Sequence, residues 1–88
     1  MASPNVIALP AGEWTKVATN VTHGVVDRMS GASPALQVTY RMNGEAAPED
    51  LADASLWDGD QLVIQAPAGI DVYFYASGEV AGSVKVCV

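Results

Sequence analysis

The sequence has very few of the residues that stabilise or activate small domains through covalent or metal bonds. Its 88 residues include one cysteine, Cys87, and one histidine, His23. A single cysteine excludes an intrachain disulfide, and structural zinc needs about four closely placed Cys or His ligands. We therefore predict neither a cofactor nor a metal site. A domain this short buries only roughly 60–65% of its unfolded surface, so we expect association with other subunits to add stability.

Basic side chains and long apolar runs are scarce as well. Four lysines and arginines stand against ten acidic residues, for a net charge of −6, and the four bases are scattered. Because phosphate recognition needs clustered basic residues, nucleic acid is a poor partner. No apolar run reaches the eighteen residues typical of a membrane span, and residues 1–5 lack the basic and apolar parts of a signal peptide. We expect no membrane partner and synthesis in a cytoplasm.

Alternation of apolar and polar residues is the main pattern that the sequence contains. It is clearest in residues 70–77, where Ile70, Val72 and Phe74 alternate with more polar neighbours. The same pattern predicts further strands at residues 6–9, 14–18, 24–29, 36–42, 62–66 and 83–88. Turn residues gather between them at 10–12, 30–34, 43–44, 58–60, 66–69 and 77–78. This spacing predicts one domain, 1–88, folded as a small antiparallel β-sandwich or jelly-roll-like barrel of about seven to eight strands.

Few residues are suited to catalysis. His23 is the one imidazole, with Asp27 four positions on, and no serine stands in a Gly-x-Ser-x-Gly turn. We interpret His23 as a turn residue and predict that the chain is not an enzyme. Six of the ten acidic residues fall between Glu45 and Asp60. Their spacing does not match an EF-hand, so a solvated loop, with one helical turn at residues 48–54, is favoured over a calcium site.

Two groups of aromatic residues are candidates for recognition. If Phe74 faces the core, Tyr73 and Tyr75 lie on the opposite face of the same strand, and Val63 extends that face on a neighbouring strand. An uncharged face with tyrosines is typical of an interface, so Val63, Tyr73 and Tyr75 form a candidate protein interface; isolated exposed aromatics are the other interpretation. Trp57 fits core packing or contact with a ligand.

Five sequence stretches together resemble small virion structural proteins of tailed bacteriophages: 9–17 (LPAGEWTKV), 36–40 (LQVTY), 65–73 (QAPAGIDVY), 76–78 (ASG) and 84–86 (VKV). These are capsid decoration or cement proteins and head-fibre β-sandwich modules. The resemblance implies a non-enzymatic homo-oligomer, a dimer or trimer, made in the host bacterial cytoplasm. It would sit on the capsid surface and brace the major capsid protein or other virion subunits, with residues 1–5 as a flexible arm. The alternative is a carbohydrate- or receptor-binding module of a phage fibre or tail, with Trp57 and the acidic loop contacting the ligand.

Overall fold

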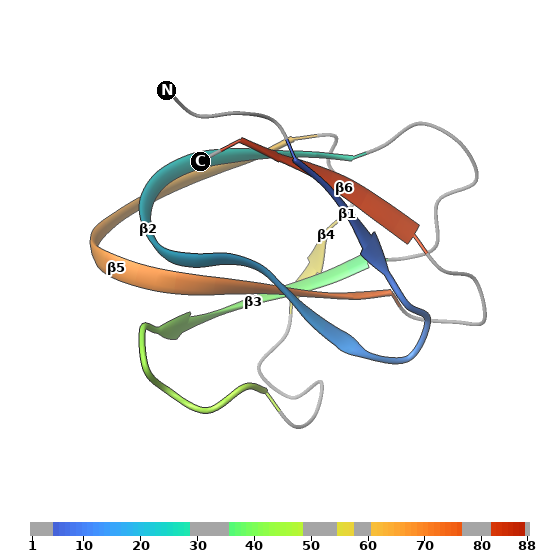
Figure 1. Ribbon diagram of the computed structural model, residues 1–88, viewed down its shortest axis with the longest axis horizontal. Coiled ribbons are helices and arrows are strands. Elements are labelled where there is room, and N and C mark those ends of the chain that lie inside the picture. Colours follow the sequence, from blue (N-terminus) through green and yellow to red (C-terminus); the bar gives the residue numbers. More distant parts are fainter. Residues whose placement is uncertain (1–4, 29–35, 49–54, 58–60, 77–81, 88) are drawn as a thin grey trace.

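The computed structural model describes residues 5–28, 36–48, 55–57, 61–76 and 82–87. These residues form six strands of one antiparallel sheet in the order β1-β6-β2-β5-β3-β4, curled into a half-barrel (Figure 1). The strands are β1 (Asn5–Leu9), β2 (Trp14–Arg28), β3 (Leu36–Met42), β4 (Ser55–Trp57), β5 (Gln61–Ala76) and β6 (Gly82–Cys87). The prediction of an all-β fold is confirmed. The sandwich arrangement and the count of seven to eight strands are not confirmed.

Two long strands and one short strand that was not predicted explain the difference in strand count. Residues 14–18 and 24–28 are both part of β2, residues 62–66 and 70–76 are both part of β5, and β4 matches no predicted strand. The cluster at 66–69, expected as a turn, lies inside β5. Pro67 and Gly69 bend the strand there but do not reverse it. Figure 1 shows β2 and β5 curving round together at this bend.

Register irregularities between β2 and β5 accommodate the bend: the first two each place an extra residue in β2, and the third leaves residues 66–69 of β5 opposite Thr22 alone. The pairing of β2 with β5 shifts register three times between Lys16 and His23. Bulges of this kind increase the local bending and twist of a strand. Asn20, within the bulged stretch, has a φ of +52°. A Cβ added to Gly69 would lie 1.8 Å from Oδ1 of Asn20, so a larger residue at this position would force the exposed Asn20 side chain to turn away.

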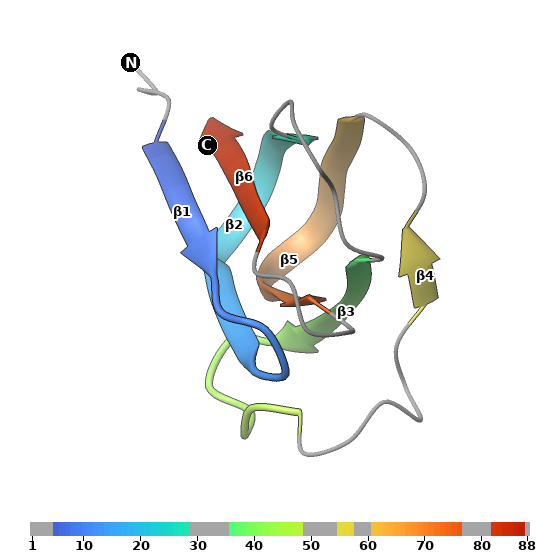
Figure 2. The ribbon, with the colours of Figure 1, turned by 90° about the vertical axis from the view of Figure 1, so that its right-hand side faces the viewer.

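The bend divides β5 into two halves with different surroundings. The first half, residues 61–65, pairs with β2 alone among the described strands, whereas residues 70–76 pair with β2 on one side and β3 on the other. On its other side, the end of β2 pairs with β6, and β6 in turn pairs with β1. Figure 2 shows β1 and β4 at opposite ends of the curled sheet.

The hydrophobic core fills the inner face of the half-barrel. Phe74 lies at its centre with no exposed surface, and the Trp57 ring packs edge-on against it with 5.1 Å between centroids. The core consists of the apolar side chains Leu9, Val17, Ala18, Val26, Leu36, Val38, Trp57, Ile64, Val72, Phe74, Ala76, Val84 and Val86. All six strands contribute to this cluster, so both halves of the sheet share one core.

Two glycine turns hold the strand ends in place. The Gly12 N–H, in the β1–β2 turn, donates to the Ala76 carbonyl at 3.0 Å, which ties this turn to the end of β5. Gly44 follows β3 with a φ of +95°, and the Glu45 N–H donates to the Met42 carbonyl across it. This geometry suits glycine at the third position of a type II turn. The predicted turn at 43–44 is confirmed.

Candidate functional site

Exposed hydrophobic side chains lie on sheet edges that have no neighbouring strand within the described residues. Val6 on β1 is 57% exposed, Leu56 on β4 is 68% exposed, and Val63 on the first half of β5 is 61% exposed. None of the three edge segments, residues 5–9, 55–57 and 61–65, contains a charged side chain. Proteins commonly protect free edges with charged residues, proline or bulges. These three segments lack such protection and are suited to pairing with another chain.

Other one-sided segments are protected. Residues 14–24 of β2 carry Lys16 and the three register shifts, and the end of β3 carries Arg41. Bulges and basic side chains both discourage the addition of a further strand. Being paired on one side therefore does not by itself leave a segment unprotected. The three uncharged segments differ from the other one-sided segments in their residues and their regular pairing.

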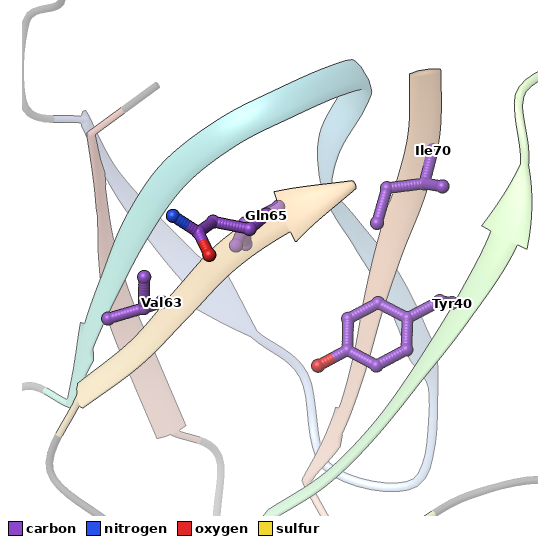
Figure 3. Close-up of a pocket in the computed structure, with 5 residues that line it drawn as sticks. Tyr40, Val63, Gln65 and Ile70 are labelled. Atoms are coloured by element: carbon purple, nitrogen blue, oxygen red, sulfur yellow. The ribbon is translucent and has the colours of Figure 1, made fainter. Parts of the chain in front are cut away.

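A shallow pocket of about 230 Å³ opens beside the first half of β5 (Figure 3). Its lining consists of Tyr40 from β3 and of Val63, Ile64, Gln65 and Ile70 from the two halves of β5. Figure 3 shows the Tyr40 ring reaching from β3 toward residues 63–65. Partial burial raises the pKa of the Tyr40 hydroxyl. The lining offers an apolar surface and two uncharged polar side chains, Tyr40 and Gln65.

The three residues of the predicted interface have different environments. Val63 is exposed, but Tyr73 is 4% exposed and Tyr75 is half-buried. Tyr73 lies outside the core cluster, as expected, but Lys16 Nζ is 5.7 Å from its ring centroid. Tyr75 packs on Trp14 at 5.3 Å. Tyr73 is therefore covered almost fully, and Tyr75 in part, by the side chains opposite them on β2.

Trp57 is buried. Its ring is 8% exposed and lies between Phe74 on the core side and Arg28, whose Cζ is 4.7 Å from the ring centroid. The Arg28 guanidinium also donates to the Trp57 carbonyl. The core-packing interpretation of Trp57 is confirmed, and the ring does not offer a platform for a sugar. Residues 49–54 and 58–60 of the acidic segment, with the expected helical turn, lie outside the described residues, as do residues 1–4 of the expected arm.

A buried carboxylate, which the sequence did not single out, holds the bend. Asp71 Oδ1 accepts hydrogen bonds from the Asn20 N–H at 2.9 Å and from Asn43 Nδ2 at 3.1 Å, and Lys16 Nζ lies 3.6 Å from Oδ2. The Asn20 hydrogen bond, then that of Asn43, lowers the pKa of Asp71, with Lys16 adding to the effect against the opposing cost of burial. The cluster joins β2, β5 and the turn after β3. Its role is structural, since each group is already satisfied by another.

The remaining polar candidates do not assemble a reactive site. His23 is exposed, with Nδ1 3.1 Å from Thr22 Oγ1, while Asp27 accepts a hydrogen bond from Gln61. Four positions along a strand separate two residues by roughly 13 Å, so Asp27 does not orient His23. In the described ranges, no three His, Cys, Asp or Glu residues gather as metal ligands do. The same ranges contain no helix long and apolar enough to cross a membrane.

No family model matches the chain, and neither a curated protein nor a solved structure does so. The resemblance to phage structural proteins thus stays a prediction from the sequence.

Proposed function

We propose that this protein is a non-enzymatic structural module that binds other protein subunits through the free edges of its sheet. One observation carries this proposal: three uncharged edge segments each present a hydrophobic residue that is more than half exposed, Val6, Leu56 and Val63. A free edge offers unpaired backbone N–H and C=O groups, and an added strand gains hydrogen bonds along with side-chain contacts. Both kinds of interaction are available at these segments.

Other classes of ligand fit the described surface less well. A net charge of −6 opposes nucleic acid. The carbohydrate- or receptor-binding alternative needs an exposed aromatic platform, and the Trp57 ring is packed between Phe74 and Arg28. Among its lining residues the pocket beside Tyr40 holds one ionisable group, the Tyr40 hydroxyl, and no second group that would assist it in acid–base or nucleophilic chemistry.

The proposed partners are the major capsid protein or other subunits of a tailed-phage particle, with the module on the capsid surface. This part of the proposal is supported by the resemblance of the sequence. In such an assembly a strand contributed by a neighbour would extend the half-barrel. The added strand would bring the assembled unit closer to the sandwich- or barrel-like closure that the sequence predicts.

Co-sedimentation with purified capsid shells of a phage that encodes the chain tests this function. We expect wild-type protein to pellet with shells and to saturate at a fixed ratio to the shell subunit. Val6→Lys and Leu56→Lys place charges on free edges and should reduce the bound fraction. Thr22→Lys adds the same charge at an exposed position on the bulged part of β2 and serves as the matched control. Wild-type protein that stays in the supernatant at all concentrations would contradict the proposal.

A further inference from the structure

The first half of β5 is unpaired on one side among the described residues, although β5 lies between β2 and β3 in the strand order of the sheet. Residues 61–65 pair with β2 on one side, and β3 joins β5 only from Ile70 onward. Along this segment Gln61, Val63 and Gln65 are exposed, while Ile64 is buried and Leu62 is half-buried. The segment therefore has one solvent-facing row, with one glutamine on each side of Val63, and one apolar row that faces the core. Its second backbone edge has no partner among the described strands.

The sequence of this segment is symmetric in polarity. It reads Gln-Leu-Val-Ile-Gln, with Val63 at the centre. If two copies pair antiparallel about a two-fold axis through Val63, Gln61 lies opposite Gln65 of the second copy, and Leu62 lies opposite Ile64. Cross-strand neighbours on one face interact directly. Amide then meets amide, and apolar meets apolar, at every position of the pairing.

The charge distribution also permits this pairing. Each copy carries a net charge of −6, so two copies repel each other unless their contact is uncharged. Every residue from Gln61 to Ile70 is uncharged. An edge strand without charge and rich in Leu, Val and Ile is the type that pairs with another edge. Pairing through this segment therefore brings two acidic copies together without opposing like charges within it.

The other free edges are less suited to self-pairing. A two-fold pairing of β1 about Ile7 would set Asn5 opposite Leu9, a polar residue against a fully buried one. β4 has only three residues. The one-sided part of β2 carries Lys16 and bulges, and the end of β3 carries Arg41. The comparison favours the first half of β5 as the edge that meets its own copy.

We propose that two copies of this chain form a two-fold dimer by antiparallel pairing of residues 61–65, with Val63 on the axis. The two half-barrels then share one continuous sheet. The partner copy's Leu62 comes beside Ile64, which lines the pocket with Tyr40, so the dimer also covers apolar surface at the pocket. The inference rests on the proposed function, because both hold that the protein associates through free edges of its sheet. It adds that the partner at residues 61–65 is a second copy of the chain.

Mass measurement tests the dimer first. Size-exclusion chromatography with light scattering should give twice the 9.1 kDa of one chain for the wild type over a concentration series. Val63→Lys places a positive charge from each copy opposite the other on the axis, and this repulsion should raise the dimer Kd by about tenfold or more. Val63→Thr keeps a β-branched residue and should leave the dimer intact. Circular dichroism checks that both variants keep the wild-type fold, as expected for a position 61% exposed.

Crosslinking tests which edge is used. In a Cys87→Ser background, Val63→Cys places two thiols opposite each other on the axis, and mild oxidation should yield a covalent dimer. Val6→Cys, on the β1 edge, is the matched control because Val6 is nearly as exposed but lies away from the proposed axis. A covalent dimer from the Val63 variant alone supports the proposal. Equal crosslinking of both variants, or of the Val6 variant alone, overturns it.

The dimer and the proposed function fail in different ways. A wild-type protein that remains monomeric throughout the series overturns the dimer, even if it pellets with capsid shells. A Val63→Lys protein whose dimer Kd equals that of the wild type also overturns it. A dimer that is lost in Val63→Lys supports the inference, and failure of that wild-type dimer to pellet with shells would contradict the capsid function alone.

Discussion

The two halves of β5 are parts of one strand with opposite relations to the rest of the molecule. Residues 70–76 are paired on both sides, by β2 and β3, and five of the seven are buried. Residues 61–65 are paired by β2, with β3 absent, and three of the five are exposed. Both halves have apolar residues at alternating positions. The number of neighbouring strands, and not the hydrophobic pattern, decides which half is interior and which is available for docking.

The difference also separates folding from association. The second half holds Phe74, which joins the core contributions of the other strands, and Asp71, which fixes the bulge of β2. The first half contributes Ile64 to the core and leaves Val63 in solvent. Changes in the second half should therefore alter the stability of the single chain, whereas changes on the outer row of the first half should alter its assembly.

The largest expected effect is the loss of Phe74. Phe74→Ala removes a fully buried ring beneath Trp57 and should lower the free energy of unfolding by about 3–5 kcal/mol. Urea denaturation followed by tryptophan fluorescence measures the change. Phe74→Leu, a milder truncation that keeps the fold measurable, should cost less. If Phe74→Leu is as stable as the wild type, the second half does not anchor the core.

The bend between the two halves gives the next largest effect. Gly69→Ala brings a Cβ to 1.8 Å from Asn20 Oδ1, and because that atom ends an exposed side chain that can turn away, the change should cost about 1 kcal/mol in unfolding free energy. Asn20→Gly removes the obstructing side chain at a residue with positive φ, a conformation that glycine adopts readily. The double variant should therefore recover part of the loss in thermal denaturation. A loss that Asn20→Gly does not reduce would show that the two residues are not in contact.

The buried carboxylate at the bend gives a smaller, pH-dependent effect. Because folding lowers the pKa of Asp71, its charged form stabilises the fold above its unfolded pKa. This contribution disappears as the pH falls through the lower folded pKa. Asp71→Asn should lower Tm at neutral pH, and the gap to the wild type should narrow in acid. Asn43→Ala, which removes one of the two hydrogen bonds to Oδ1, should give an intermediate profile. A gap that is constant with pH would contradict this role.

The smallest effect is expected on the outer row of the first half. Val63→Thr should change the unfolding free energy of the single chain by less than about 0.5 kcal/mol, since surface substitutions away from special features usually do. Chemical denaturation at a protein concentration where the wild type is monomeric isolates this quantity. A loss comparable to that of Gly69→Ala would mean that Val63 packs within its own chain.

Parts of the fold were accessible to sequence reasoning because they depend on local patterns. Alternation at residues 70–77 correctly put Val72 and Phe74 inside, and Asn43 with Gly44 correctly marked a turn. The bends in β2 and β5 were missed because Pro67 and Gly69 mark a turn and a bend equally well. Of the predicted interface, Val63 is exposed, whereas Tyr73 is covered by Lys16 from the opposite strand.

The sequence by itself determined that this chain forms strands with one apolar row and that its surface is acidic, since side-chain alternation and charge are properties of consecutive residues. The tertiary structure alone decided that Asp71 and Tyr73 are buried and that residues 61–65 form a free edge. Burial on the outer face and the status of an edge depend on which distant strands lie alongside. Which strands pair depends on the whole sheet and cannot be read from the residues of a single strand.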